Sequence, residues 1–227
     1  MLFLLLLLSL PAHAFQTLYA GEPVPRTSQV WRHTVLLISN TGSQCSGVIV
    51  SSEWLLTAAH CAAYGLKEVV FFVGSNQEYA RLPVLKAVPH RNYFSGRPSG
   101  QDYDLALVKF SSLPSNHFFA PLLAHRAPSV GDAITLAGFG QNGPGGDRSK
   151  GLHEAKTKLL SQNRANYFFY LTEAGTGGAC QGDSGGPAFN AKGELVGIIT
   201  RKMGNLGCDA PAESVFIELG YFRSWVN

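Results

Sequence analysis

The chain has 227 residues, of which 45% are hydrophobic and 15% are charged. This composition allows a sizeable core without a metal ion, and the length fits one β domain or two small ones. The formal net charge is only +3, and the basic residues are scattered rather than clustered as in a nucleic-acid-binding protein. We therefore expect a globular protein with no nucleic-acid partner, no metal and no cofactor.

An almost unbroken apolar run, Leu2 to Leu10, opens the chain and is followed by Pro11 and by the small-x-small sequence Ala12-His13-Ala14. This pattern is typical of a secretory signal peptide, here residues 1–14. The run is far shorter than the ~20 residues of a membrane-spanning helix, and no second run of that length follows. We therefore expect a secreted or periplasmic protein without a membrane anchor.

Four cysteines in an oxidising compartment are expected to form disulfide bonds. Of the three pairings, we prefer Cys45 with Cys61 and Cys180 with Cys208, because each bond then closes a short loop around a candidate site segment. Zinc is the alternative use of four cysteines, but the paired short C-x-x-C spacings of zinc sites are absent.

Short runs of β-branched and aromatic residues, bounded by Gly, Pro, Asn and Ser, recur along the chain. This pattern is typical of antiparallel sandwiches or barrels. The runs span residues 34–39, 48–50, 69–73, 105–110, 133–137 and 195–200. Helical periodicity is confined, after the signal peptide, to residues 58–63 and 221–226. Residues 114–128 are the candidate crossing between two halves, and the Gly-rich segment 138–151 is expected to be an exposed, mobile loop.

The segment Gly182 to Pro187, which reads GDSGGP, contains the candidate nucleophile Ser184. Serine is a weak nucleophile unless a neighbouring base takes its proton. The glycines lack a Cβ, so the backbone can direct the N–H groups of Gly182 and Ser184 to one point and hold an oxyanion there. The alternative interpretation is a surface turn, because Gly, Asp, Ser and Pro are ordinary turn residues.

His60 is the candidate base, because a histidine titrates near neutrality and can take and return a proton. It follows the small residues Ala58 and Ala59, which leave room for a substrate, and precedes Cys61, whose bond to Cys45 would fix the backbone. We interpret the other histidines after the signal peptide as satisfied core residues: His33, His90, His117, His125 and His153.

Asp104 is the candidate third member, since a buried carboxylate that accepts the imidazole N–H would hold the ring in the useful tautomer. Asp102 is the alternative. We prefer Asp104 because it directly precedes the apolar run at 105–110, whereas Asp102 fits a solvated loop.

Three segments together resemble the signatures of the chymotrypsin-like (trypsin family) serine proteases. They are TAAHC at 57–61, DLAL at 104–107 and GDSGGP at 182–187. The resemblance extends from about residue 18 to the end of the chain. The α/β-hydrolases share the pattern G-x-S-x-G, but their serine comes first and their histidine last, whereas the order here is His60, Asp104, Ser184.

This resemblance implies an all-β fold of two antiparallel six-stranded barrels with a short C-terminal helix. The first barrel would span about residues 18–121 and the second about 122–227. It also implies a serine endopeptidase that acts on polypeptides through a Ser184–His60–Asp104 triad and an acyl-enzyme, with Gly182 and Ser184 forming the oxyanion hole. We expect a monomer that a protein inhibitor can bind. The alternative is a catalytically silent, protease-like binding protein.

The resemblance further implies an activation pair, in which the carboxylate of Asp183 binds the newly freed amine of Leu18. Removal of residues 15–17, a short pro-segment, would free that amine. The residue before Leu18 is Thr17, not the Lys or Arg that tryptic activation cuts. We therefore expect a different peptidase, or stepwise trimming, to remove the segment.

The resemblance places Gly178 and Ala179 at the base of the specificity pocket, Thr200, Arg201 and Lys202 along one wall, and Ser214 at another lining position. If the alignment with the family is shifted by one residue, Glu213 takes that position instead of Ser214. Gly178 offers no carboxylate to pair with a Lys or Arg side chain of the substrate, so a preference for these residues is not supported. Arg201 and Lys202 would either admit an acidic side chain or block the pocket.

Overall fold

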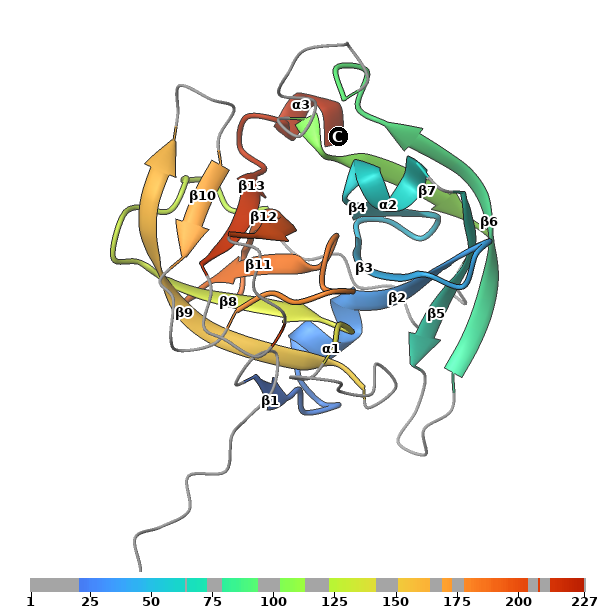
Figure 1. Cartoon of the computed structure of the whole chain (residues 1–227), viewed down its shortest axis with the longest axis horizontal. Coiled ribbons are helices and arrows are strands. Elements are labelled where there is room, and N and C mark those ends of the chain that lie inside the picture. Colours follow the sequence, from blue (N-terminus) through green and yellow to red (C-terminus); the bar gives the residue numbers. More distant parts are fainter. Residues whose placement is uncertain are drawn as a thin grey trace, which may run out of the picture.

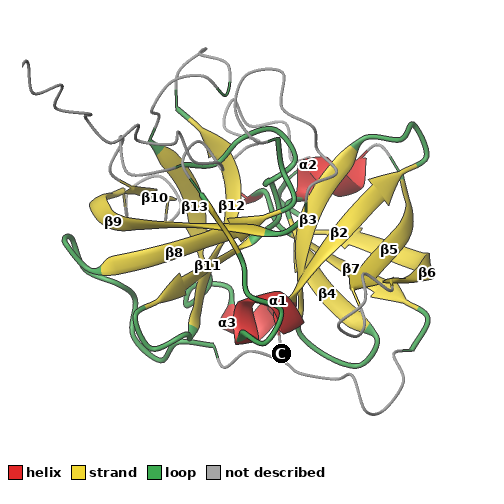
Figure 2. Cartoon of the chain, turned by 90° about the horizontal axis from the view of Figure 1, so that it is seen from below, coloured by secondary structure: helices red, strands yellow, loops and turns green. Residues whose placement is uncertain are grey.

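The computed structural model describes residues 21–63, 65–72, 79–93, 103–112, 123–141, 151–163, 169–172, 178–203, 208 and 213–226. The signal peptide, the pro-segment, Leu18 and the boundary expected at 121/122 lie outside these residues. Within the described part, the chain forms two β-barrels that lie side by side (Figures 1 and 2).

The first barrel closes in the order β2-β3-β4-β7-β6-β5, and all its strand pairs are antiparallel. Its interior is a cluster of aliphatic and aromatic side chains that includes Leu37, Leu55 and Phe110. The strands are β2 (Thr34–Ser39), β3 (Gln44–Ile49), β4 (Trp54–Thr57), β5 (Leu66–Phe72), β6 (Tyr79–Pro89) and β7 (Ala106–Phe110).

The second barrel closes because β8 pairs with both β9 and β11, which completes the ring β8-β9-β10-β13-β12-β11. A short strand, β1 (Glu22–Pro23), extends it along β9. The strands are β8 (Ala133–Gly138), β9 (His153–Asn163), β10 (Phe169–Thr172), β11 (Pro187–Asn190), β12 (Leu195–Lys202) and β13 (Ser214–Glu218). Two antiparallel six-stranded barrels were the predicted fold, and that prediction is confirmed.

The six predicted strand runs all correspond to strands, but most of them are too short. The run at 34–39 coincides with β2, whereas β3 begins at Gln44 rather than at residue 48 and β12 continues to Lys202. Leu105, included in a predicted run, precedes β7. Strand ends extend into polar residues because ladder hydrogen bonds, and not side-chain type, decide where pairing stops.

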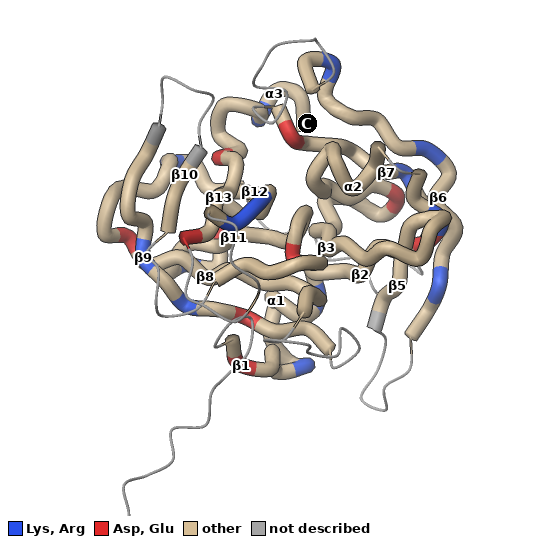
Figure 3. Tube along the Cα trace, in the orientation of Figure 1, with Lys and Arg blue, Asp and Glu red and all other residues tan. Residues whose placement is uncertain are grey.

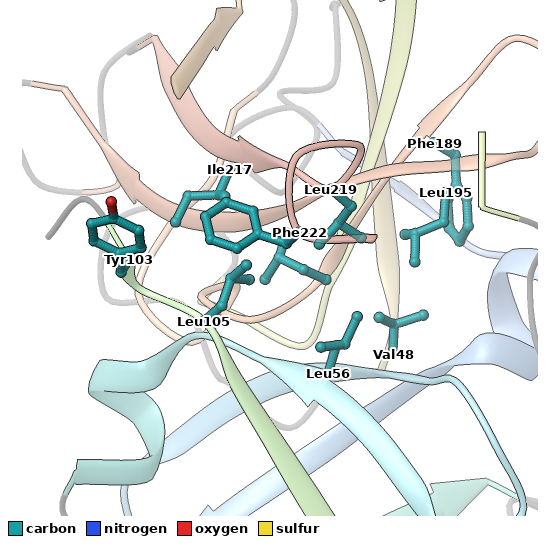
Figure 4. Close-up of a cluster of buried hydrophobic side chains, with 10 residues drawn as sticks. Val48, Leu56, Tyr103, Leu105, Phe189, Leu195, Ile217, Leu219 and Phe222 are labelled. Atoms are coloured by element: carbon teal, nitrogen blue, oxygen red, sulfur yellow. The ribbon is translucent and has the colours of Figure 1, made fainter. Parts of the chain in front are cut away.

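An apolar cluster joins the two barrels and is drawn in Figure 4. Val48, Leu56 and Leu105 come from the first half of the chain, and they pack against Ile217 and Phe222 from the second half. Close-packed apolar contact of this kind fixes the position of one barrel on the other. Residues carried by the two barrels can therefore form one site at their junction.

Three short helices accompany the barrels in the described residues. The helix α1 (Gln29–His33) begins where the Ser28 hydroxyl accepts the N–H of Trp31, a standard N-cap. The others are α2 (Ala59–Ala63) and α3 (Arg223–Val226), both within the segments predicted to be helical. Sequence periodicity missed α1 because five residues make little more than one turn.

The segment 138–151 is not exposed at its start, contrary to the prediction. Gly138 is the last residue of β8, and Phe139 is only 2% exposed because it packs beside Val24 and Leu152. Residues 142–150 and most of the expected crossing, residues 113–122, lie outside the described part. Among the described helices, none has the length and apolar character needed to span a membrane.

Candidate active site

His60 lies in α2, directly after β4, and is bound twice by Asp104. The backbone N–H of His60 donates to Oδ1 of Asp104 at 2.8 Å, and Nδ1 of the ring lies 2.7 Å from Oδ2. An ionised carboxylate only accepts hydrogen bonds, so Nδ1 carries the proton and Nε2 is left as the basic nitrogen. The structure thus brings these two predicted site residues together in the tautomer that a general base needs.

Asp104 is 5% exposed. His90 contacts the residues on either side of it in sequence, Tyr103 and Leu105, and so holds Asp104 in place. The backbone N–H of His90 donates to the carbonyl of Leu105 at 2.8 Å, and its ring stacks on Tyr103 with centroids 4.9 Å apart. Burial, and secondarily the positive charge of Arg91, lower the pKa of His90, which favours the neutral ring. This role of His90 was not predicted from the sequence. The alternative carboxylate, at position 102, lies outside the described residues.

The other histidines outside the site differ in burial. His33 and His153 are both 5% exposed, as expected for core residues. Burial lowers the pKa of His153, while a hydrogen bond to the carbonyl of Gly151 opposes that shift. His125 is exposed, so its interpretation as a core residue is wrong. His117 lies outside the described residues.

Ser184 projects from the loop between the 178–180 segment and β11, and its hydroxyl donates to the carbonyl of Thr200 at 3.2 Å. In the described part of the chain, no hydrogen bond joins this hydroxyl to His60. Nε2 of His60 instead lies 3.6 Å from Sγ of Cys61. Catalytic hydrogen bonds are often long or misaligned until substrate binds. The arrangement is therefore that of a base and a hydroxyl that have not yet formed their hydrogen bond.

Gly185 shows why the loop around Ser184 requires glycine. Its φ is +86°, a left-handed conformation that side chains disfavour. A Cβ at this position would also collide with Oγ1 of Thr57 and with the carbonyl of Ser46, both in the first barrel. The absence of a side chain thus lets the serine loop lie directly on β3 and β4.

The N–H groups of Gly182 and Ser184 are oriented through the carbonyls that share their peptide planes. In a trans peptide the N–H points away from the C=O. Both carbonyls accept a backbone hydrogen bond that fixes the orientation of the peptide. Within the described residues, neither of the two N–H groups donates a hydrogen bond to the protein. Both are therefore available to an oxyanion. The orienting bonds are Gln141 N to Gln181 O at 2.8 Å and Gly186 N to Asp183 O at 2.9 Å.

Ser46 on β3 binds the serine loop from the first barrel and was not identified from the sequence. Its hydroxyl donates to the carbonyl of Gly182 and accepts the N–H of Phe139, each at 2.9 Å. Its own N–H donates to the carbonyl of Ser184 at 2.8 Å. Ser46 is fully buried, so these bonds are shielded from water. A serine within a strand carries no distinctive sequence signal, which is why it was missed.

Asp183 is a fully buried carboxylate next to Ser184, the candidate nucleophile. Oδ1 accepts the N–H of Gly140 and Oδ2 accepts that of Cys180, both at 2.8 Å. Burial raises the pKa of Asp183 to about 7, although these two hydrogen bonds oppose the shift. A cation beside the carboxylate would offset the burial and keep it ionised.

Both disulfide bonds lie beside the site, with Cys45 joined to Cys61 and Cys180 joined to Cys208. These are the pairs preferred from the sequence. Cys45, His60 and Cys61 together form a group of three potential metal ligands. Because the two sulfurs are bonded to each other, neither is a thiolate, and this group does not offer the ligand set of a zinc site.

Of the residues expected to form the specificity pocket, Thr200 contacts Ser184, and Ala179 contacts Ser214. Gly178 and Ala179 are buried, and the N–H of Ala179 donates to Oγ of Ser214 at 2.7 Å. Thr200 contributes its carbonyl, the acceptor of the Ser184 hydroxyl, while its own side chain bonds to Val215.

Arg201 and Lys202 follow Thr200 at the end of β12 and are half-buried. Lys202 lies opposite Ser214 in the ladder with β13. Glu213, the alternative to Ser214, precedes β13, and its carbonyl accepts the N–H of Met203.

Two six-stranded barrels with a serine, a histidine and an aspartate at their junction define the chymotrypsin-like class. The sequence matches the Trypsin family over residues 19–226. The chain therefore belongs to the trypsin family, and it is a serine endopeptidase.

Proteins from distant organisms share this similarity. Snake venom serine protease 3 from Protobothrops jerdonii is 30% identical over 245 residues, covering 99% of this chain and 91% of the relative. Kallikrein-7 from Homo sapiens is 30% identical over 227 residues, covering 91% and 85%. The solved structure of neuropsin, a serine protease expressed in the limbic system of mouse brain, is 24% identical and matches with a TM-score of 0.74. That match covers 91% of this chain and 96% of neuropsin, and shows a shared fold.

Replacing Ser46 with alanine is expected to weaken both folding and turnover. The change removes the hydroxyl that binds the part-buried carbonyl of Gly182 and the buried N–H of Phe139, which costs ~1–3 kcal/mol in the free energy of unfolding. Urea unfolding and peptide hydrolysis measure the two effects. The control is Ser43→Ala, which removes an exposed hydroxyl from the same hairpin. An S46A protein as stable and active as S43A would contradict the role assigned to Ser46.

In a chain that retains the residues before Leu18, Asp183 should make the free energy of unfolding depend on pH. The pKa of this carboxyl is 3.8 in the unfolded chain and about 7 when buried, so between these values the folded state binds the extra proton. The free energy of unfolding should therefore fall as pH rises from about 4 to about 7. The test compares urea unfolding with that of Asp183→Asn, because His90 and His153, with their lowered pKa values, act in the opposite direction. A difference between the two proteins that does not change with pH would contradict this assignment.

Proposed function

We propose that this serine endopeptidase is exported and cleaves peptide bonds through Ser184, His60 and Asp104, by way of an acyl-enzyme. The observation that carries the proposal is the double contact between His60 and Asp104, at 2.8 and 2.7 Å, beside a serine on the other barrel. A histidine oriented in this way has one role open to its remaining nitrogen, the transfer of a proton.

In the proposed reaction, Oγ of Ser184 attacks the carbonyl carbon of the substrate while Nε2 of His60 takes the hydroxyl proton. Asp104 stabilises the imidazolium that results, and the N–H groups of Gly182 and Ser184 bind the oxyanion. The carbon–nitrogen bond breaks as His60 returns the proton to the leaving amine. A water molecule, activated by His60, then hydrolyses the ester on Ser184 and restores the free enzyme.

The hydroxyl of Ser184 has to leave Thr200 before this reaction can begin. Its present bond of 3.2 Å is near the long limit for an O–H donor and is therefore weak. Rotation about the Cα–Cβ bond moves Oγ between staggered positions at little cost. The proposed reaction thus needs a side-chain rotation and no rearrangement of the backbone.

Asp183 and Leu18 are proposed as the activation pair. Pro23 in β1 lies opposite His153 in β9, and His153 lies opposite Gly138 in β8, which borders the carboxylate of Asp183. Two strand spacings amount to ~10 Å, and the five residues from Leu18 to Pro23 can span about 17 Å. The amine of Leu18 can therefore reach the carboxylate, where it would neutralise the buried charge.

Export, quaternary structure and partners complete the proposal. The apolar run and small-x-small sequence before residue 15 support secretion or transport to a periplasm. Polypeptides are the substrates of the family. We propose that the chain acts as a monomer, that a protein inhibitor can occupy the same site, and that the reaction needs no cofactor.

A catalytically silent binding protein is the second candidate. The hydrogen bond from Ser184 to Thr200, in place of one to His60, is the observation that favours it. Against it stand the retained carboxylate–imidazole pair and the two open N–H groups beside the serine. The two candidates differ in whether Ser184 reacts.

Reaction with a serine-directed phosphonate distinguishes them. Mass spectrometry should find one label per molecule, on Ser184, and none in Ser184→Ala. Asp104→Asn should lower turnover on the order of ten-thousandfold, because His60 then loses the partner that sets its tautomer. An unlabelled wild-type protein would instead identify a binding protein.

The start of the active protein is expected to be Leu18. N-terminal sequencing of secreted, phosphonate-reactive protein measures this directly, and Asp183→Ala should be secreted but react slowly with the phosphonate because it lacks the carboxylate that binds the amine. An active form that still begins at Phe15 would show that the amine of Leu18 is not required.

A further inference from the structure

A pocket lies between the first barrel and the C-terminal helix α3. Its volume is about 470 Å³, which is within the range of small-molecule sites in proteins. Trp54, which lines it, is the first residue of β4, whereas His60 lies beyond the last residue of that strand, so the pocket is separate from the active site. The six lining residues are Val50, Ser51, Trp54, Leu107, Trp225 and Val226.

The walls of this pocket are held in place by contacts within the protein. The carbonyl of Trp54 accepts the N–H groups of Val50 and Ser51, both at 3.0 Å, and so closes the turn between β3 and β4. On the other wall, the ring of Trp225 meets that of His90 edge to face, with centroids 5.1 Å apart. Four of the lining side chains also pack against the apolar cluster that joins the barrels. A pocket with such walls is formed before a ligand arrives.

The size of the pocket and its two indole rings indicate an aromatic ligand. An apolar cavity of ~150 Å³ holds benzene, so a volume of about 470 Å³ can hold a molecule of two or three fused rings. Trp54 and Trp225 are half-buried, so each keeps ring surface that a ligand can cover. Aromatic rings that stack or meet edge to face gain more than their buried area alone provides.

The polar side-chain groups of the lining are hydrogen-bond donors. The hydroxyl of Ser51 accepts the N–H groups of Glu53 at 3.3 Å and of Trp54 at 3.0 Å. These bonds use both of its lone pairs and leave its O–H to donate. An indole N–H can only donate, and within the described residues those of Trp54 and Trp225 have no acceptor. A ligand with an acceptor oxygen therefore complements the lining.

The charges beside the pocket form a pair with each other. Lys109 is opposite Trp54 in the β4–β7 ladder, and its Nζ lies 3.4 Å from Oε2 of Glu53 and 5.9 Å from the centre of the Trp54 ring. Figure 3 shows blue and red segments next to each other at β7. None of the six lining side chains is charged. The surroundings of the pocket therefore favour a neutral ligand over an ion.

We propose that this pocket binds a neutral aromatic molecule of two or three rings that carries a hydrogen-bond acceptor oxygen. The rings pack against Trp54 and Trp225, and the oxygen accepts a hydrogen bond from the Ser51 hydroxyl or from an indole N–H. The bound molecule joins α3 to the first barrel. The inference does not depend on the proposed function, because none of the lining residues takes part in the proposed reaction.

The test is a titration of the purified protein with Prodan, a neutral naphthyl ketone whose fluorescence shifts to shorter wavelength in an apolar environment. The wild-type protein should bind one probe per molecule with a Kd of about 0.2 mM or lower, the affinity expected from the ligand efficiency of a molecule of this size. Trp54→Ala removes one wall and should raise the Kd about tenfold or more. The control Trp31→Ala removes a half-buried indole from α1, outside the pocket, and should leave the Kd unchanged.

A second variant keeps the test valid if W54A does not fold. Val226→Trp adds a ring to the pocket instead of removing one, and should also raise the Kd about tenfold or more. Urea unfolding without the probe shows whether each variant is folded. A wild-type protein that does not bind Prodan, or folded variants at positions 54 and 226 that bind it as the wild-type protein does, would overturn the inference.

A pair of competing ligands tests the hydrogen bond. Acetylnaphthalene and ethylnaphthalene have nearly the same shape, but only the first carries an acceptor oxygen. Acetylnaphthalene should displace Prodan from the wild-type protein at a lower concentration, because it satisfies a donor of the lining that ethylnaphthalene leaves unpaired. Equal displacement by the two molecules would show that the pocket does not select for the acceptor, and would contradict the proposed ligand class.

Discussion

The site depends on hydrogen bonds that join the nucleophile loop of the second barrel to a strand of the first. Ser46 in β3 binds the carbonyls of Gly182 and Ser184, through its hydroxyl and its N–H. His60 and Asp104 belong to the first barrel, so without these bonds the position of Ser184 relative to them would depend mainly on the apolar contact between the barrels. Apolar contact is not directional, whereas hydrogen bonds fix orientation within narrow limits of distance and angle. The geometry of the reacting groups is thus set by polar contacts at the junction.

The same loop contains a buried carboxylate, Asp183, and in the proposed activation this carboxylate would couple catalysis to the state of the N-terminus. Asp183 lies between the two residues whose N–H groups form the proposed oxyanion hole, and two backbone N–H groups already bind its carboxylate. Those bonds do not offset its burial, because the pKa remains raised to about 7. A cation that pairs with the carboxylate would stabilise the loop conformation in which both N–H groups are open. The proposed activation by a new N-terminal amine would meet that electrostatic requirement.

The sequence predicted the chemistry of the site better than its supporting contacts. Ser184, His60 and Asp104 each lie in a short segment that resembles a signature of the serine proteases, so they could be selected individually. Ser46 could not, since its role depends on carbonyls 136 or more residues away. The strand β6 contains Pro83, a residue that argues against a strand; it is tolerated because the pairing of β6 with β7 begins only at Val84, directly after Pro83. The strand β9, which contains two Lys, two Leu, and one each of Glu, Ala and Gln, consists largely of helix-forming residues and is extended because β8 and β10 pair with it.

The central claim is that the groups at the barrel junction act as one covalent catalyst. Rapid mixing with an ester whose acyl group leaves Ser184 slowly tests it most directly, since a covalent intermediate releases the first product in a burst. The account predicts a burst equal in amount to the enzyme, absent from Ser184→Ala and strongly slowed in His60→Ala. Hydrolysis that continues in Ser184→Ala, without a burst in the wild-type protein, would contradict it.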